Sequence, residues 1–178
     1  MSEEKSPHNF SEREFQFLKQ MVQKMGPPIP HKIFRLIAHR FVLTPVEAVV
    51  LRKKDSKIQV LLIKRDPDDP DWGGQLHSPG TILRANDEDG KRSYSSALRR
   101  LEERELKTKF SKPPILITPW FHRGNRGIEN AMIFLCQIKG DPPVGKFYNI
   151  DSLPKNIIKS QVGFIKLTAK EAIAKKFL

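Results

Sequence analysis

The part of the chain that determines the fold reads WGGQLHSPG at residues 72–80 and SYSSALRRLEEREL at residues 93–106. Gly73 and Gly74 predict a turn after the Asp- and Pro-rich stretch over 66–72, because that composition cannot continue a strand. The second stretch predicts the clearest helix in the centre of the chain. Its apolar residues recur at helical spacing and form one buried stripe: Tyr94, Ala97, Leu98 and Leu101.

Runs rich in β-forming residues lie on both sides of this segment. Four strands are expected: Val46–Leu51 and Ile58–Ile63 before it, and Ile115–Trp120 and Ala131–Ile138 after it. A polar turn over 54–57 joins the first pair as a hairpin, whereas a polar loop over 122–130 separates the second pair. Thr168 and Glu171 form a capping-box pattern, which predicts a last helix from there through Lys176.

The first 45 residues predict two helices ahead of the strands. Ser11 and Glu14 form a capping-box pattern at the start of a helix over 11–25. Residues 26–30, which include three prolines, end that helix, and a basic amphipathic stretch follows from His31 to Arg40. This stretch has the pattern of a helix packed on the domain's own sheet, and a membrane-surface helix is the alternative.

Composition indicates one soluble globular domain with modest extensions, since the chain has 178 residues. The single cysteine, Cys136, excludes a disulfide framework and indicates the reducing cytoplasm. The first residues do not form a signal peptide, and no apolar run reaches the ~18 residues of a membrane span. The net charge of +12 would suit an anionic partner, but basic residues recur along the whole chain. The positive charge could therefore belong to a functional basic patch or to a generally basic, solvated surface.

With these elements in place, residues 72–106 resemble the Nudix box. The family pattern is Gly, five residues, Glu, seven residues, then Arg-Glu-aliphatic-x-Glu-Glu-x-Gly-aliphatic, usually after a Trp/Gly lead-in and Pro-Gly-Gly. The resemblance extends over about residues 46–177, and residues 147–154 resemble the family's segment before its last helix. It implies an α/β (α+β) domain over 46–178, a Nudix-type mixed sheet sandwiched between helices, with residues 1–45 as an N-terminal helical extension.

The helix matches the box at three positions and departs from it at three. Arg99, Leu101 and Glu103 match the box arginine, the aliphatic position and the first paired glutamate. The departures place arginine or leucine where the family has Glu, Glu and Gly: Arg100, Arg104 and Leu106. The loop also departs, because Thr81 replaces the second Gly and Lys91 stands at the opening Glu. That loop is four residues longer than the pattern allows.

In the family the helix glutamates hold divalent cations on a nucleoside diphosphate, and oxygen ligands suit Mg²⁺ or Mn²⁺. α-Helical spacing places Arg100, Glu103 and Arg104 on one face. At ~4 Å near a protein surface, each repulsive charge costs about 4 kcal/mol, so no cation cofactor is expected. The resemblance therefore implies a nucleotide or other phosphate-containing ligand, with hydrolysis weak or lost. Expected phosphate-binding residues are Arg99, Arg100, Arg104 and Gly80, and the residual catalytic candidates are Glu103 and Glu129.

Three alternatives stay open. An active Mg²⁺- or Mn²⁺-dependent hydrolase would use a rearranged carboxylate set such as Glu102, Glu103 and Glu129. The acidic loop residues Asp87, Glu88 and Asp89 could assist it, although this composition is also typical of a solvated turn. The helix charges could instead be a solvated face with one Arg99–Glu103 pair. A basic RNA- or protein-binding module is the third alternative, although no RNA-binding motif supports nucleic acid as the partner. Three aromatics suit base stacking or rim packing: Trp72, Phe121 and Phe147.

Overall fold

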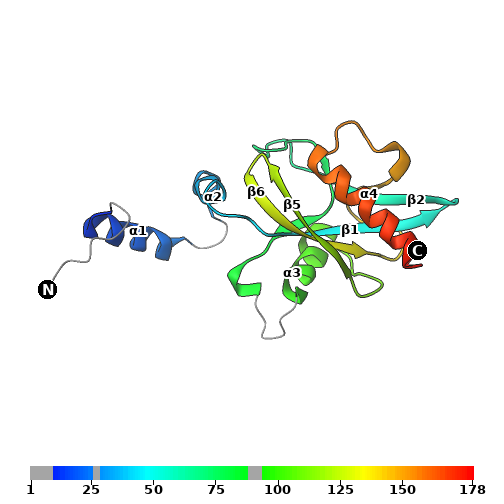
Figure 1. Cartoon of the computed structure of the whole chain (residues 1–178), viewed down its shortest axis with the longest axis horizontal. Coiled ribbons are helices and arrows are strands. Elements are labelled where there is room, and N and C mark those ends of the chain that lie inside the picture. The colour runs from blue at the N-terminus through cyan, green and yellow to red at the C-terminus, as the bar shows by residue number, and fades with distance from the viewer. Residues whose placement is uncertain (1–9, 26–28, 88–93) are drawn as a thin grey trace. The chain divides into compact units, whose positions relative to one another are not determined.

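The computed structural model describes residues 10–25, 29–87 and 94–178. The chain falls into two compact units, Met1–Ile37 and Ala38–Leu178 (Figure 1). In the first unit, α1 spans Glu12–Lys24 and α2 begins at His31, ending at Ala38 of the second unit. The Ser11 capping box is confirmed: Ser11 N–H donates to Glu14 Oε2 at 2.8 Å, and Glu14 N–H donates to Ser11 Oγ at 3.4 Å.

The second unit is built on a seven-stranded mixed sheet in which β3, β2, β1, β6 and β5 follow one another. β4 also pairs with β1, β7 pairs with β2, and β1 runs parallel to β6. The strands are β1 Pro45–Lys54, β2 Lys57–Lys64, β3 Leu76–His77, β4 Gly80–Ile82, β5 Ile115–Gly124, β6 Gly127–Cys136 and β7 Lys146–Asn149. The four expected strands are all present, and β5 and β6 are longer than expected.

The polar loop expected over 122–130 is wrong, because both strands continue into a tight hairpin turn between Gly124 and Gly127. Gly127 has φ +133°, a conformation that side chains rarely adopt, and a Cβ there would lie 2.3 Å from the Ala38 carbonyl oxygen. The polar residues on either side of this turn are therefore paired between β5 and β6. The β1–β2 hairpin is confirmed, with Asp55 and Ser56 at positive φ in its turn.

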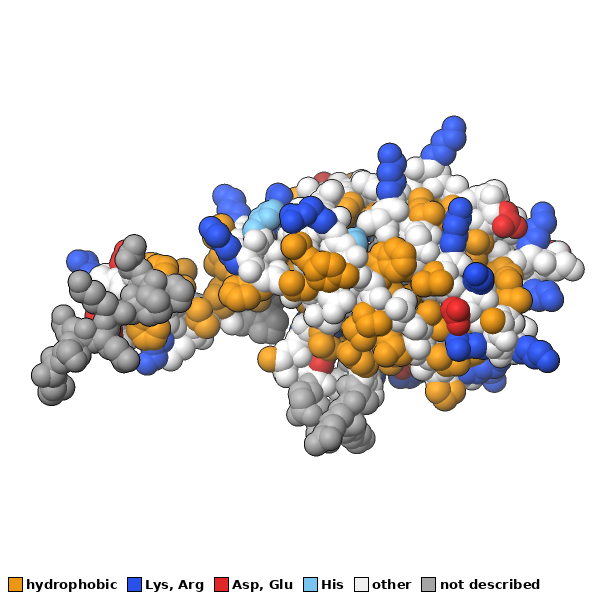
Figure 2. Space-filling view, in the orientation of Figure 1, with side chains coloured by type: hydrophobic (Ala, Val, Ile, Leu, Met, Phe, Trp, Pro, Cys, Tyr) orange, Lys and Arg blue, Asp and Glu red, His pale blue; other side chains and the backbone are white. Residues whose placement is uncertain are grey.

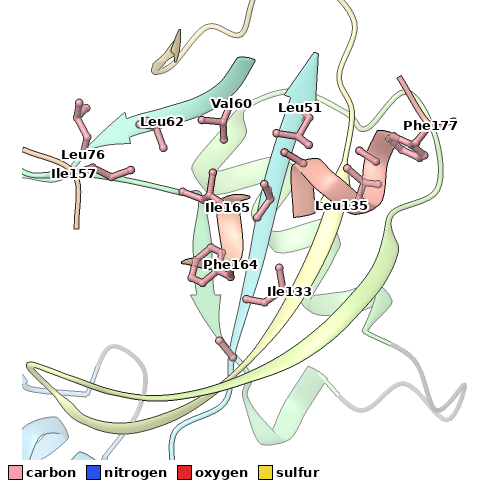
Figure 3. Close-up of a cluster of buried hydrophobic side chains, with 14 residues drawn as sticks. Leu51, Val60, Leu62, Leu76, Ile133, Leu135, Ile157, Phe164, Ile165 and Phe177 are labelled. Atoms are coloured by element: carbon pink, nitrogen blue, oxygen red, sulfur yellow. The ribbon is translucent and has the colours of Figure 1, made fainter. Parts of the chain in front are cut away.

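Helices cover both faces of the sheet, so the expected α+β sandwich is confirmed (Figure 1). α3, Ser95–Arg100, continues into the π-helical segment η2, Leu101–Leu106, and buries the expected stripe against one face. α4, Lys159–Ala174, packs Phe164 and Ile165 on the other face (Figure 3). Two short 3₁₀ segments complete the unit, η1 Ala85–Asp87 and η3 Ile150–Ser152. Burial of alternate residues of β1 against the two helices makes that strand buried on both faces.

The predicted start of the last helix at Thr168 is wrong, because α4 begins nine residues earlier, at Lys159. Thr168 lies inside the helix, where its buried hydroxyl donates to the Phe164 carbonyl oxygen at 2.8 Å and does not cap a helix end. Gly163, which lowers helix propensity, hides the true start, and a Cβ there would lie 2.9 Å from the Trp120 ring. Within the described residues, the helices are all too short or too polar to cross a membrane.

Candidate ligand site

The helix that carries the Nudix-box resemblance ends in a wide turn. The N–H of Lys107 donates to the carbonyl of Glu102, five residues earlier, and Lys107 ends the helix at φ 52°. A π-turn holds one residue more than an α-turn. Side chains after Leu101 therefore leave the positions that α-helical spacing predicts.

The charged side chains of this turn differ in their exposure to solvent. Glu103 and Arg104 are exposed, whereas Glu105 is half-buried. Burial raises the pKa of the Glu105 carboxyl, against the opposing influence of the Arg65 and Arg104 charges. The Glu105 charge also acts on Glu47 in strand β1. Of the carboxylates near the end of the helix, the one directed toward the sheet is thus Glu105, which the box pattern does not mark.

Arg100 contacts the segment after β4. The prediction that Arg100 shares one face with Glu103 and Arg104 is wrong, because Glu103 and Arg104 are exposed and Arg100 is directed toward that segment. Its Nη1 forms an ion pair with Asp87, and its Nη2 donates at 2.9 Å to the second Asp87 oxygen and at 2.9 Å to the Ile82 carbonyl. The Arg100 hydrogen bond is the main cause of a lowered pKa of Asp87. Arg100 therefore fixes the backbone that follows Gly80.

Two other expected helix residues, Arg99 and Glu102, line a separate surface pocket together with Phe110 and Lys112. Arg99 is exposed. Glu102 turns toward the chain after the helix, where its Oε1 accepts the Phe110 N–H at 2.7 Å and its Oε2 lies 3.2 Å from Lys109 Nζ. Two acidic loop residues and the basic residue at the family's opening Glu lie outside the described residues: Glu88, Asp89 and Lys91.

A polar cavity of about 80 Å³ lies where β1, β4, the β5–β6 hairpin and the start of α4 converge. The backbone of β4 from Gly80 to Ile82 forms part of its wall. Six ionisable side chains line it: Glu47, Arg65, His77, His122, Arg126 and Glu129. Of the residues predicted to form the site, the cavity wall includes Gly80 and Glu129, whereas Arg99, Arg100, Glu103 and Arg104 lie outside it.

Glu47 is buried and packs directly on Gly80. A Cβ at Gly80 would lie 2.5 Å from Glu47 Oε1, so the close approach requires glycine. Gln161 Nε2 donates to Glu47 Oε2 at 3.5 Å, and the Ser78 N–H donates to Gln161 Oε1 at 2.7 Å. Burial, and next the nearby Glu129 charge, raise the pKa of Glu47 well above 4.5. Its protonated form is therefore favoured.

Glu129 is also buried, and an arginine holds it. Arg126 Nε and Nη2 donate to Glu129 Oε1 at 3.2 and 3.0 Å. His122 Nε2 lies 3.6 Å from Glu129 Oε2. Within the described part of the chain, the buried Nδ1 of the same histidine has no hydrogen-bond partner. A polar atom of this kind suits a bound water or ligand atom in the cavity.

Trp72 joins the cavity to the loop before β3. The Arg126 guanidinium lies over its ring at 4.5 Å from the centroid, and the Arg65 guanidinium lies at 5.4 Å. Arg65 in turn donates from Nε to Asp69 Oδ2 at 2.8 Å. His77 lies in the same wall, where burial lowers its pKa to about 4 and keeps it neutral near pH 7. Of the three aromatic candidates for base stacking, Trp72 and Phe147 are packed against arginine side chains, and Phe121 is exposed.

Sequence reasoning missed several residues of this wall, among them Glu47, Arg65, His77 and Gln161. One of them carried a signal, because Glu47 is a lone carboxylate inside the otherwise apolar run over 46–51. The others carried none, since the sheet and α4 bring them together from segments far apart in the sequence.

No protein-family model matches this sequence, and no curated protein matches it. Its structure resembles Shewanella oneidensis NrtR with a TM-score of 0.57 at 18% identity, over 75% of this chain and 64% of that one. The structure also resembles the NUDIX domain of the same protein complexed with ADP ribose, with a TM-score of 0.52 and 19% sequence identity, over 92% of this chain and 99% of that one. A C. elegans Ap4A hydrolase resembles it with a TM-score of 0.54 and 16% sequence identity, over 75% of this chain and 99% of that one. The chain therefore has the Nudix fold, and it spans less than two thirds of NrtR.

The divalent cation implied by this fold does not fit the side chains at the cavity. The Glu47 carboxyl is packed against Gly80 and contacts Gln161, and Arg126 occupies one oxygen of Glu129. Outside residues 1–9, 26–28 and 88–93, no group of three or more His, Cys, Asp and Glu side chains is placed to hold a metal ion. A Mg²⁺ ion needs several oxygen ligands at about 2.0–2.1 Å, and this wall offers guanidiniums in their place.

Proposed function

We propose that the cavity binds a phosphate group of a nucleotide-type ligand, without a divalent cation and with little or no hydrolysis. The observation that carries the proposal is the state of the two wall carboxylates. Arg126 donates two hydrogen bonds to Glu129, and burial disfavours the charged form of Glu47 by raising its pKa, so both carboxylates repel an anion less than free ones would. The Arg65 and Arg126 guanidiniums line the same wall. Arg65 already pairs with Asp69 and Arg126 with Glu129, and the remaining N–H groups of each guanidinium are suited to phosphate oxygens.

The size of the cavity supports binding of a single group. About 80 Å³ accommodates several waters or one phosphate, so the sugar and base would lie outside it. Arg99 and Arg104, exposed on the helix, are proposed contacts for outer parts of the ligand. Arg100 is proposed to act indirectly, because its bonds to Asp87 and Ile82 hold the backbone beside Gly80.

The comparisons support the choice of a nucleotide. One similar structure is a complex with ADP ribose, and another is an Ap4A hydrolase. Both names describe nucleotides linked through phosphate to a further moiety. At 16–19% identity these likenesses concern the fold, so the ligand class of this chain is our proposal.

The test is a calorimetric titration of the full chain with ADP and with ADP-ribose, each with Mg²⁺ and with EDTA, alongside an assay of phosphate release. We expect binding that EDTA does not reduce, that weakens as salt is added, and that releases little phosphate. Arg65→Gln should weaken binding on the order of tenfold, because a charge-assisted hydrogen bond contributes about 1.5–3 kcal/mol.

Arg52→Gln is the matched control. Arg52 resembles Arg65 in its contacts, since it pairs with Asp141 at 2.5 Å and lies 3.8 Å from the Phe147 ring centroid, but it does not line the cavity. Equal losses of affinity in the two variants would show a general charge effect and reject the cavity. Binding that requires Mg²⁺ would reject the cation-independent site.

A divalent-cation-dependent hydrolase is the second candidate, and one observation favours it. The charges of Glu105 and Glu129 both act on Glu47, so three carboxylates gather near the cavity. Glu102 is outside this set, because it binds the Phe110 N–H. This candidate predicts phosphate release that depends on Mn²⁺ and that Glu105→Gln abolishes, in the same assay.

A further inference from the structure

A groove of about 440 Å³ adjoins the cavity and shares three of its wall residues, Trp72, Ile158 and Ser160. The Gly124–Asn125 turn of the β5–β6 hairpin forms one side, and residues 155–160 form the other. The groove is therefore continuous with the site already described and several times larger.

Hydrogen bonds fix both sides of the groove. Asn125 Nδ2 donates to the Asp71 carbonyl oxygen at 2.9 Å, which ties the hairpin turn to the loop before β3. Leu76 N–H donates to the Asn156 carbonyl at 3.0 Å, and Ile158 N–H donates to the Leu76 carbonyl at 2.9 Å. The groove is thus formed before any ligand arrives, which reduces the entropy lost on binding.

Three cations line the groove: Arg123, Lys155 and Lys159. All three are exposed, and within residues 10–25, 29–87 and 94–178 none of them forms an ion pair with a carboxylate. The lining includes no Asp or Glu side chain. On the face of the larger unit drawn in Figure 2, Lys and Arg side chains are spread among hydrophobic ones. The three cations of the groove lining, with no carboxylate among them, make the groove positively charged.

We propose that this groove binds a second anionic group of the same ligand, so that the preferred ligands carry phosphates beyond the one held in the cavity. This inference rests on the proposed function, because the first phosphate anchors the ligand. The cations supply charge for further phosphates. The amides of Gln75 and Asn156, which line the groove, supply polar contacts for a sugar or base.

The test compares adenosine tetraphosphate with ADP, which share a base and a sugar, by calorimetry in EDTA. We expect the tetraphosphate to bind the wild-type chain on the order of tenfold more tightly, as a few charge-assisted contacts allow. A triple variant, Arg123→Gln with Lys155→Gln and Lys159→Gln, should bind both ligands with the ADP affinity. Its melting temperature should match wild type, because these side chains are exposed and lack ion pairs with the described residues.

A control triple variant removes the same charge elsewhere: Lys53→Gln, Lys57→Gln and Lys170→Gln, all exposed and outside the groove lining. It should retain the tenfold preference. If the groove variant also retains the preference, or if both variants lose it equally, the groove is not a subsite and the inference fails. If neither ligand binds wild type, the proposed function fails. A single-stranded oligonucleotide that outcompetes the tetraphosphate would replace the inference with a nucleic-acid surface.

Discussion

Gly80→Ala tests whether the buried contact between β4 and Glu47 is as tight as the structure shows. A Cβ at this position would lie 2.5 Å from Glu47 Oε1 and 2.7 Å from its Cδ. Glu47 is only 7% exposed and its carboxyl group accepts a hydrogen bond from Gln161, so a shift away from the new methyl group would have to go into the small cavity and weaken that bond. Overpacking of this kind costs about 1–3 kcal/mol. For a chain of this size that corresponds to a fall in melting temperature of roughly 2–12 °C.

A double-mutant cycle separates the clash from other effects of the new methyl group. Urea denaturation of the full chain would give the cost of Gly80→Ala in the wild type and in Glu47→Ala, which removes the clashing atoms. The second cost should fall to near zero, since Gly80 does not need a positive φ. Gly140→Ala is the reverse control, because Gly140 has φ +66° and open space around it. Its cost should not change in the Glu47→Ala background. Equal costs of Gly80→Ala in both backgrounds would refute the proposed contact.

Three further predictions concern charges. The stability of Glu47→Gln relative to wild type, measured by urea denaturation, should increase as pH rises from 5 to 8. Above pH 4.5 the carboxyl of the unfolded chain ionises more readily than the buried one, whose pKa is raised. Wild type therefore loses up to about 1.4 kcal/mol of stability per pH unit, which the glutamine variant does not lose. Arg100→Ala should cost about 3 kcal/mol because Asp87 loses its guanidinium partner and, among the described residues, keeps only the Arg84 N–H bond. Exposed Arg104→Ala should cost roughly 0.5 kcal/mol by the same measurement. Mn²⁺ titrated into the chain should show no micromolar binding, and tight binding that Glu103→Ala abolishes would contradict this.

The sequence predicted the fold well because hydrophobic periodicity reports burial directly. The four strands and the buried stripe of α3 lie where the pattern placed them. The capping box, and not burial, predicted the Ser11 helix, in which no residue is buried. The wrong predictions concern polar residues that lie inside a helix or strand and not in a cap or loop. The hydroxyl of Thr168 bonds within α4 rather than capping it. Polar residues after Phe121 continue the β5–β6 ladder because the turn at Gly127 returns the chain at once.

The candidate site was less predictable, because it depends on helix geometry that a residue pattern does not reveal. A helical wheel assumes 3.6 residues per turn, and the π-turn after Leu101 breaks that assumption. Beyond Leu101, Glu105 is half-buried while Glu103 and Arg104 are exposed. The Arg100–Asp87 pair also escaped prediction, because it joins the helix to a segment beyond the long loop.

The substitutions in the box and the carboxylates of the sheet have to be considered together. With arginine at position 100, the helix binds Asp87 and the Ile82 carbonyl at that position, and the helix carboxylate whose charge reaches Glu47 is Glu105. Glu47 can then be buried against Gly80 in its favoured protonated form, and Glu129 is left with Arg126 as its partner. Two carboxylates so close in a buried wall would otherwise need a cation between them. In this chain, protonation of one and an arginine on the other relieve the same repulsion, which is why we expect the cavity to accept an anion directly.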